Sequence, residues 1–310
     1  MPSSPKKLLI LAILEILRKY TDCDHGLLQS QIIERLERDY DLTATRKSVR
    51  ANLTDLEIAG YPIDYNNGWY YEHEFCSAEL HLILDSLMYN PNIPYRQCRE
   101  LMEKVRMLGG SRFRYVSGGS LKRPENAQYL YTLDMLHEAI ESQKQIAFHY
   151  GWYDVDKQLH LRRDADGTPH EYTASPYRVV FANGRGYLIC NVSKYDDAAH
   201  FRIDRMADAA ITDIRAKPAN LVRGLEFGLN LPEYLLGHAH MFSGTPQLYR
   251  LHIKRDLAGD IMDWFGVDVQ FDNISAEEAD AWIRTDARSL KYWLKMYGEY
   301  AELSEQEPLK

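Results

Sequence analysis

Residues 45–71 read TRKSVRANLTDLEIAGYPIDYNNGWYY, and the hydrophobic period changes within this stretch. The first half has apolar residues at helical spacing, which are Val49, Leu53 and Leu56. Thr45 directly precedes them, and its hydroxyl can accept hydrogen bonds from the free N–H groups of a first helical turn. The second half alternates as a strand around Asn67-Gly68, a pair suited to the positive backbone angles of a tight hairpin. The stretch therefore predicts a helix followed by a β-hairpin.

Two further helices are predicted upstream of this stretch. Residues 6–20 are apolar on more than one helical face, and residues 28–39 have a single apolar face. Three helices and a hairpin in this order make a winged helix-turn-helix. Its third helix can enter the roughly 12 Å wide major groove of DNA.

The third helix is the predicted DNA-reading element because residues 42–54 contain no Asp or Glu. Cations there can replace the counterions of phosphates, an amide can reach a base edge, and the hairpin can touch the adjacent backbone. The residues predicted to contact DNA are Thr45, Arg46, Lys47, Ser48, Arg50, Asn52, Asn66 and Asn67. The alternative is that the cations of this helix form a solvated face, which is the usual role of a charge run.

The charge of the whole chain restricts the kind of nucleic-acid partner. A net charge of -8 argues against a protein that coats nucleic acid without specificity. A second acid-free window, residues 104–124, carries Lys104, Arg106, Arg112, Arg114, Lys122 and Arg123. It follows two helices predicted within residues 77–108 and separated by Pro91 and Pro94. We interpret residues 74–128 as a helical connector through which the chain forms a homodimer.

The pattern changes again from residue 129. A helix precedes short alternating strands at residues 145–150, 178–190 and 199–203, which predicts a small β-barrel or sandwich. The last part of the chain alternates strand, helix, strand and helix, which predicts a βαβα unit. The fold class is therefore α+β multidomain. The expected domains are 1–73, the winged helix-turn-helix; 74–128, the connector; 129–215, the barrel; and 216–310, the βαβα extension.

Several functions are not expected from this sequence. No apolar stretch reaches the ~18 residues of a membrane span and the start of the chain lacks a signal-peptide layout, so we expect a cytoplasmic protein with no membrane partner. No nucleophile elbow or phosphate-binding loop is present. The segment TDCDH at residues 21–25 and the pair His238 and His240 lack further ligands at metal-binding spacing. We therefore expect no catalytic residue, no metal, no cofactor and no enzyme activity.

Taken together, these segments resemble the bacterial WYL-domain transcriptional regulators. The resemblance spans nearly the whole chain and depends on the order and spacing of its motifs. The matching segments are LAILEILRKYTDCDH, TRKSVRANLTDLEIAGYPI, HLILDSLMYNPNIPYRQCRELMEKV, ASPYRVVFANGRGYLICN, HFRIDRM, HMFSG, GDIMDWFG and LKYWLKMYG. The tripeptide that names the family falls on residues 186–188, where its first aromatic position is Gly186. The loop Arg163 to Tyr172 is also longer than the family usually shows.

The resemblance implies an Sm-like or SH3-like barrel that senses a nucleotide or a short nucleic-acid ligand. Guanidinium groups suit phosphates, and tyrosine rings can stack on bases. The ligand-binding residues that the resemblance implies are Tyr150, Tyr177, Arg178, Tyr187, Arg202 and Arg205. The alternative is that Tyr150 and Tyr187 belong to the barrel core and that Arg202 pairs with Asp204 or another carboxylate.

The sequence thus predicts a ligand-responsive, homodimeric transcription regulator that binds double-stranded operator DNA. A second possibility is an RNA or single-stranded nucleic-acid binding module that works through the barrel surface. A third, less favoured one is a nucleotide-processing enzyme.

Overall fold

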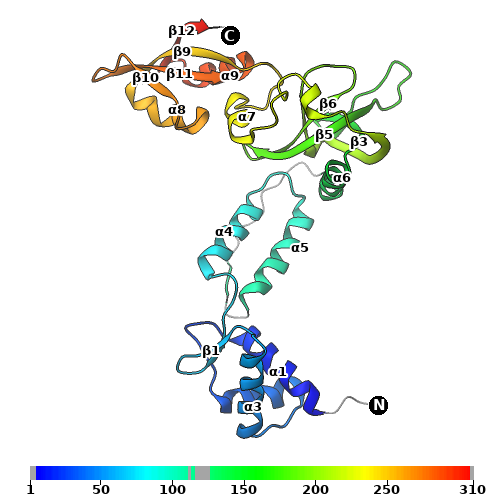
Figure 1. The fold of residues 1–310 in the computed structure, drawn as a ribbon, viewed down its shortest axis with the longest axis vertical. Coiled ribbons are helices and arrows are strands. Elements are labelled where there is room, and N and C mark those ends of the chain that lie inside the picture. Colours follow the sequence, from blue (N-terminus) through cyan, green and yellow to red (C-terminus); the bar gives the residue numbers. More distant parts are fainter. Residues whose placement is uncertain (1–4, 111–112, 116–125, 308–310) are drawn as a thin grey trace. The chain divides into compact units, whose positions relative to one another are not determined.

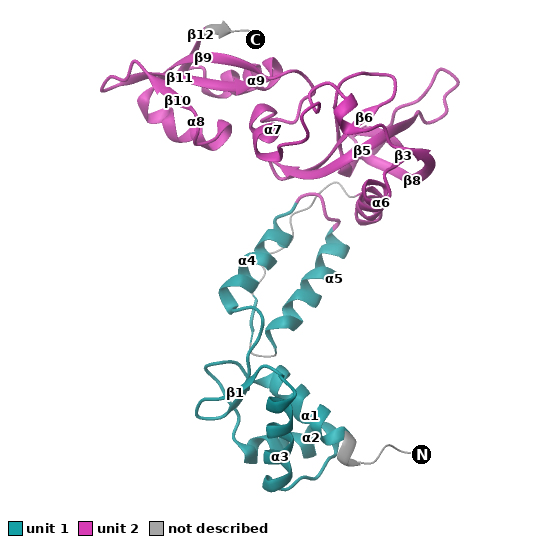
Figure 2. Cartoon of the chain, viewed as in Figure 1, with its two compact units in different colours: residues 1–90, 95–123 teal, residues 91–94, 124–310 magenta. Residues whose placement is uncertain are grey.

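The computed structural model describes residues 5–110, 113–115 and 126–307, and the chain divides into two compact units. The first unit comprises residues 1–90 and 95–123, and the second comprises residues 91–94 and 124–310 (Figure 2). Three cations of the second acid-free window, Arg112, Lys122 and Arg123, lie outside the described residues. The finer division into four domains stays a prediction.

The first unit begins with three helices whose apolar faces meet in one core. They are α1 (Pro5–Tyr20), α2 (Gln29–Tyr40) and α3 (Arg46–Ile58) (Figure 1). Ile13, Leu36 and Leu53, one from each helix, are fully buried in this core. The helical spacing of the apolar residues explains the packing, because it gives each helix one face that water disfavours.

A two-stranded hairpin follows α3 and is fixed to the helices. Strand β1 (Ile63–Tyr65) pairs antiparallel with β2 (Trp69–Tyr71), and Trp69 is buried in the helical core. The link between α1 and α2 joins the hairpin, since Leu27 and Trp69 exchange two backbone hydrogen bonds of 2.8 Å each. The hairpin is therefore positioned by the core and by a backbone pairing.

Two more helices complete the first unit. They are α4 (Ser77–Met88) and α5 (Tyr95–Arg106), and a short 3-10 turn, η1 (Met107–Gly109), follows them. The helices pack against each other, and each buries one apolar stripe, with Leu84 and Met88 on α4 and Cys98 and Met102 on α5.

The second unit contains a six-stranded, antiparallel sheet that curls around its own core (Figure 1). Helix α6 (Tyr129–Glu141) packs against this sheet. The strands are β3 (Lys144–Tyr153), β4 (Leu159–Leu161), β5 (Glu171–Ala182), β6 (Arg185–Val192), β7 (Ala199–Arg202) and β8 (Met206–Arg215), with the 3-10 turn η2 (Ile203–Arg205) before β8. Their order is β4-β3-β5-β6-β7, and β8 also pairs with β3. Asn183 and Gly184 adopt positive φ angles of 49° and 67° in the two-residue turn between β5 and β6, as the sequence predicts.

The C-terminal part of the second unit has a separate four-stranded sheet. The elements from the end of β8 onward are η3 (Ala219–Leu221), α7 (Leu231–Gly237), β9 (Gln247–Lys254), η4 (Arg255–Leu257), α8 (Ala258–Phe265), β10 (Gln270–Asp272), β11 (Glu278–Thr285), α9 (Ala287–Tyr297) and β12 (Ala301–Glu307). The strand order is β10-β11-β9-β12, all antiparallel, around a core that includes Leu251, Ile261 and Trp293. The predicted order of strand, helix, strand and helix is present. The structure adds the strands β10 and β12, which were not predicted from the sequence.

No helix among the described residues combines the length and the apolar composition that a bilayer span requires.

Candidate functional site

The start of α3 presents two free cations. Thr45 precedes the helix, and its hydroxyl accepts a hydrogen bond of 3.2 Å from the backbone N–H of Ser48. Arg46 and Lys47 are exposed in the first turn, and neither forms an ion pair with a carboxylate of the described residues. The positive end of the helix dipole adds to their charge, so this end of α3 attracts anions.

Arg50 lies one turn further along α3 and connects this helix to the hairpin. Its side chain is exposed, and its guanidinium carbon lies 5.1 Å from the centre of the Trp69 ring. Val49 and Leu53 on the opposite side of α3 are fully buried and fix the rotation of the helix. A cation over an indole face is attracted by the ring electrons, so Arg50 is held on the surface between α3 and β2.

Asn52 is more constrained than the sequence suggested. Its amide nitrogen donates a hydrogen bond of 2.8 Å to the Ser48 carbonyl one turn earlier, and the side chain is half-buried. Its amide oxygen and its second N–H therefore remain available to a base edge, in the orientation that this bond fixes.

The hairpin loop carries Asn66 and Asn67, which are both exposed. The register pairs Tyr65 with Trp69, which leaves three residues in the loop, and only Asn67 has a positive φ, of 53°. The prediction that Gly68 also needs a positive angle is wrong. Glycine is required there because a Cβ atom would lie 2.5 Å from the Gly26 carbonyl carbon in the neighbouring backbone.

On the curled sheet, Arg202 is bound to a carboxylate of its own segment. Its Nε and Nη2 atoms donate hydrogen bonds of 3.0 and 2.7 Å to the two carboxylate oxygens of Asp204. The side chains are 22% and 9% exposed, so the pair is largely shielded from water. The sequence-derived alternative, in which Arg202 pairs with Asp204, therefore describes the observed contact.

Tyr150 and Tyr187 are both neighbours of Arg202 on this sheet. The Tyr150 hydroxyl accepts a hydrogen bond of 3.2 Å from the backbone N–H of Arg202, and its ring contacts Phe201 edge-on at 4.9 Å. Tyr187 pairs in register with Arg202 and packs against an apolar cluster that includes Val180. Burial raises the pKa of both tyrosines, so both hydroxyls are protonated near neutral pH.

Arg205 lies in the same turn as Asp204 and is half-buried. Its Nε atom is shielded from water and has no hydrogen-bond partner within the described part of the chain. Its charge acts on the Tyr150 hydroxyl, whose pKa it lowers against the larger effect of burial. Tyr150, Arg202 and Arg205 are thus brought together, whereas the ion pair already uses much of the Arg202 hydrogen-bonding capacity.

The space beside Gly186 is filled by a tyrosine from α6. A Cβ atom at Gly186 would lie 2.8 Å from the hydroxyl oxygen of Tyr129, and Tyr129 is only 1% exposed. The Tyr129 ring therefore occupies the position toward which a larger residue at 186 would point. Burial raises its pKa, and its hydroxyl has no hydrogen-bond partner among the described residues.

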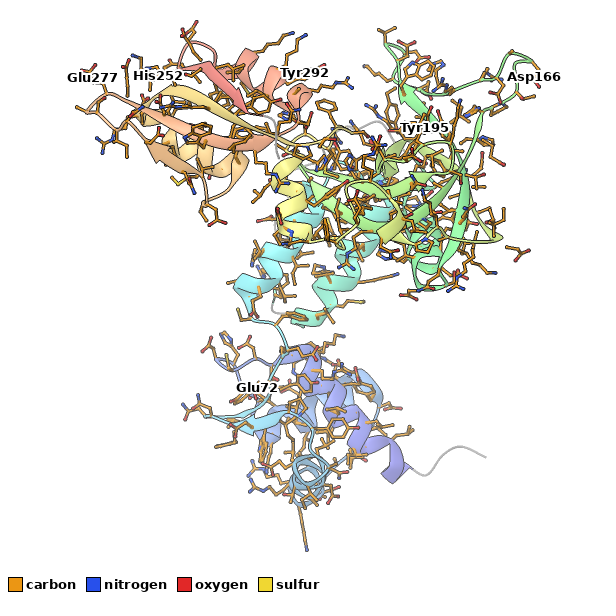
Figure 3. All side chains as sticks on the ribbon, turned by 45° about the horizontal axis from the view of Figure 1, so that its top comes forward. Glu72, Asp166, Tyr195, His252, Glu277 and Tyr292 are labelled. Atoms are coloured by element: carbon orange, nitrogen blue, oxygen red, sulfur yellow. The ribbon has the colours of Figure 1, made fainter. Side chains whose placement is uncertain are left out.

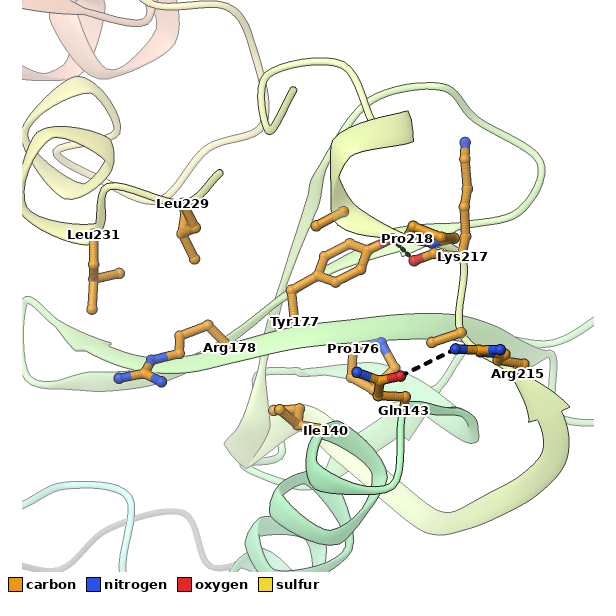
Figure 4. A pocket seen from close by; sticks show the side chains of 12 residues that line it. Ile140, Gln143, Pro176, Tyr177, Arg178, Arg215, Lys217, Pro218, Leu229 and Leu231 are labelled. Atoms are coloured by element: carbon orange, nitrogen blue, oxygen red, sulfur yellow. Dashed lines mark hydrogen bonds between the residues drawn. The ribbon is translucent and has the colours of Figure 1, made fainter. Parts of the chain in front are cut away.

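Tyr177 and Arg178 line a pocket of about 740 Å³ that the other four predicted ligand residues do not line (Figure 4). Tyr177 lies at a bulge in β5, and its hydroxyl donates a hydrogen bond of 2.9 Å to the Lys217 carbonyl. Burial raises the pKa of Tyr177 to about 12, so the hydroxyl remains a donor at neutral pH. The six residues are therefore divided between two places on the sheet.

The sequence prediction missed three polar residues of this pocket, which are Gln143, Arg215 and Lys217. Gln143 joins α6 to β3 with a positive φ of 53°, while Arg215 is the last residue of β8 and Lys217 lies two residues after it. The alternation of cations in Arg215-Ala216-Lys217-Pro218 was the available signal. It was not interpreted because nothing nearby in the sequence indicates which surface these side chains share.

The residues considered for a metal site do not converge. His25 contacts Asp22 at 2.6 Å on the surface, and His238 bonds to backbone carbonyls, whereas His240 stacks on Trp264 with ring centres 4.9 Å apart. Within the described residues, no group of three or more His, Cys, Asp or Glu side chains could hold a metal ion.

The long loop after β4 forms a projecting hairpin. Asp166 lies at its tip and accepts hydrogen bonds from the backbone and hydroxyl of Thr168 (Figure 3). At its base, His170 contacts Asp164 at 2.6 Å. None of the six predicted ligand residues belongs to this loop.

Two comparisons with known proteins bear on this sheet and on the chain. The family model described as WYL domain matches residues 131–211. The solved structure of proteasome accessory factor B/C (PafBC) of Arthrobacter aurescens is similar at 15% sequence identity with a TM-score of 0.30, over 97% of this chain and 46% of that one. This chain thus spans about half the length of that protein. No curated protein matches the sequence.

The matched residues begin in α6 and end in β8, so they cover the curled sheet and the helix that packs on it. They include Arg202, Arg205 and the pocket residues Tyr177 and Arg178. The resemblance predicted from the sequence is therefore confirmed at this level: a WYL domain is found at residues 131–211.

Proposed function

We propose that this chain is a homodimeric, DNA-binding transcription regulator of bacteria. Its first three helices and the hairpin act as a winged helix-turn-helix that reads double-stranded operator DNA in the cytoplasm. The WYL domain, as a small Sm-like barrel, binds an effector and changes the affinity for the operator. An effector can do so only if it binds one arrangement of the chain better than another.

The observation that carries the proposal is the free cationic surface at the start of α3. Arg46, Lys47 and Arg50 are exposed and, among the described residues, pair with no carboxylate, although the chain carries a net charge of -8. Cations that are free in an acidic protein can bind phosphates without first breaking an ion pair. The neighbouring loop with Asn66 and Asn67 extends the same proposed surface toward the adjacent DNA backbone.

Exposed apolar side chains on α4 support the dimer. Leu82 on α4 is 69% exposed, and Tyr89, the residue directly after α4, is 60% exposed; both would lose water contact in a helix-to-helix interface. A dimer of winged helices binds two half-sites, which provides the contacts that one small domain lacks.

The proposed role is binding rather than catalysis, because the sequence has no nucleophile elbow or phosphate-binding loop. Duplex DNA is favoured over single strands for a separate reason: the free cations lie on a helix that can fit a major groove.

The experiment is a gel-shift titration with the chain's own promoter at fixed salt. We expect Arg46→Ala with Arg50→Ala to weaken binding at least tenfold, or about 1.4 kcal/mol, because the variant loses two cationic contacts. The wild type should bind the duplex more tightly than either single strand, and light scattering of the same preparation should give the mass of a dimer.

The matched control is Arg38→Ala with Arg96→Ala, which removes the same charge from arginines that already pair with Asp39 and Glu100. This control should keep its operator affinity. If the test variant binds as tightly as the wild type, α3 does not read DNA. If single strands bind better than the duplex, the protein is the single-strand binding module instead.

A further inference from the structure

The pocket beside Tyr177 has the size of a small-molecule site. Its volume is about 740 Å³, within the roughly 300 to 1,000 Å³ that ligand pockets occupy. Its walls come from the end of α6, the bulge in β5, the segment after β8 and the approach to α7. A short organic molecule fits such a volume, whereas an oligonucleotide does not.

The charges around this pocket have one sign. Arg178, Arg215 and Lys217 line it, no lining residue is acidic, and none of the three cations pairs with a carboxylate among the described residues. Carboxylates elsewhere on the sheet do take partners, as Asp204 takes Arg202 and Asp213 takes Lys144. The pocket therefore retains positive charge in a chain whose net charge is negative.

The arrangement of these groups limits the shape of a ligand. Arg178 lies at one end of the pocket below Leu229 and Leu231, and Arg215 lies at the other end beside Gln143 (Figure 4). The Nη2 atom of Arg215 is 3.5 Å from the Gln143 amide oxygen, a weak contact that leaves most of its donors free. The Tyr177 ring lies between the two ends, held by the hydrogen bond from its hydroxyl to Lys217.

Apolar side chains supply the remaining walls. Ile140 from α6 and Leu231 from α7 line the same space as the arginines. Apolar walls favour a ligand body that is itself apolar, while a guanidinium binds a carboxylate or phosphate through two parallel hydrogen bonds. Neither an uncharged apolar molecule nor a bare inorganic anion would use both features.

We propose that this pocket is the effector site and that it binds a small organic anion with an aromatic or apolar body, anchored by Arg178 and Arg215. The inference deepens the proposed function and rests on it for the regulatory meaning of the binding. Arg215 and Gln143 then belong to the effector site, although the sequence did not indicate them. Arg202 has a different task, because it is already bound to Asp204.

The test is isothermal titration of the full chain without DNA, with 2-naphthyl phosphate as the probe. We expect measurable binding of the phosphate ester, and at least tenfold weaker binding of 2-naphthol, which lacks the charge, and of inorganic phosphate, which lacks the ring. Adenosine monophosphate forms a separate arm, and tighter binding than 2-naphthyl phosphate would identify the body as a nucleoside.

The variants are Arg178→Gln and Arg215→Gln, each exposed in the free protein and therefore replaceable without unfolding it. Each should weaken probe binding at least fivefold, and the double variant should abolish it. The control is Arg162→Gln, an exposed arginine of the same unit outside the pocket, which should bind as the wild type does.

Unchanged probe affinity in the double variant would overturn the proposal, and so would equal affinity for 2-naphthol. Because the titration contains no DNA, this failure is distinguishable from failure of the proposed function. A chain could bind its promoter and ignore the probe, or bind the probe and ignore its promoter.

Discussion

At the scale of single residues, Arg202 holds the turn before β8 through its ion pair with Asp204. Its bidentate bond with Asp204 is largely shielded, and the Asp204 carbonyl also accepts hydrogen bonds from Asn126 and Tyr153. The turn before β8 is therefore held by its side chains and by its backbone. A carboxylate in such a place needs a partner, because removing the partner leaves a charge with little water around it.

We expect Arg202→Ala to lower the free energy of unfolding by about 3 kcal/mol, since Asp204 remains charged and unpaired. Urea unfolding followed by circular dichroism measures the effect. Arg178→Ala, which removes an exposed arginine of the same sheet, should change stability little.

Adding Asp204→Ala to the Arg202→Ala variant should restore part of the lost stability, because the unpaired charge is then gone. Additive losses in the double variant would contradict the assignment of a coupled pair.

Single-residue roles were the least predictable part of the candidate site. The residue types at Tyr150, Tyr187 and Arg202 suit a ligand, but the same types suit a core tyrosine or an internal ion pair. A ligand-binding role and a structural role differ in which side chains lie next to the residue on the neighbouring strands of the sheet. That pairing is set by strand register, and the sequence does not display it.

At the scale of elements, the hairpin after α3 depends on one close approach of two backbones. Gly68 and Gly26 lie so near each other that a Cβ atom on either would meet the other's backbone, at 2.5 Å for Gly68 and at 2.4 Å for Gly26. The exchange of hydrogen bonds between Leu27 and Trp69 follows directly from this approach. The hairpin and the link between α1 and α2 therefore form one structural piece.

We expect Gly68→Ala to destabilise the first unit by more than 2 kcal/mol, because the backbones must separate and break those bonds. Thermal unfolding of the full chain followed by circular dichroism would report the change. Asn66→Ala, in the same loop but exposed, is the control and should shift the midpoint by less than a degree or two. A stable Gly68→Ala variant would show that the approach is not needed.

The elements themselves were largely predictable where their signal is local. The helices of the first unit follow from apolar spacing, and the turn at Asn183-Gly184 follows from the two residues that tolerate its angles. Strands β4 and β10 have three residues each, and neither was predicted, whereas the equally short β1 and β2 were predicted because they flank Asn67-Gly68. Strand β12, AELSEQE, is mostly polar because it lies at the edge of its sheet, with β9 as its one neighbour among the described strands.

At the scale of the whole molecule, a half-buried histidine joins the curled sheet to the segment around α7. His200 on β7 bonds to the Tyr234 hydroxyl at 2.7 Å and to the Met241 carbonyl at 3.2 Å. In the neutral ring, Nδ1 donates to the carbonyl and Nε2 accepts from the hydroxyl. Burial, with the nearby His238 ring, lowers the pKa of His200 to about 4.

This contact makes the second unit sensitive to acid. The unfolded histidine takes up its proton near pH 6.5, whereas the folded one does not until about pH 4, so protons favour the unfolded chain. Stability should therefore be full above pH 6.5 and should fall by up to about 3 kcal/mol as the pH drops to 4. Urea unfolding at pH 6.5, 5.5 and 4.5 measures this loss.

The control is His200→Gln, which removes the titrating group. Its stability should depend less on pH over the same range than that of the wild type. Parallel curves for the two proteins would assign the acid sensitivity to other groups.

The pocket is the feature of the whole molecule that could not be predicted from the sequence. Its walls come from four segments that are far apart in the chain, and Gln143, Tyr177 and Arg215 meet there only after the sheet has curled. The sequence indicated that Tyr177 and Arg178 bind a ligand, but it could not indicate that Arg202 lies elsewhere.

The contact between Arg50 and Trp69 has a practical consequence for spectroscopy. Trp69 is the single indole in residues 1–123, and its ring lies under a guanidinium group that belongs to the proposed DNA surface. Indole emission responds to the electric field of a neighbouring charge. The protein thus carries a native fluorophore next to the side chain of interest, and no dye has to be attached to follow what that side chain does.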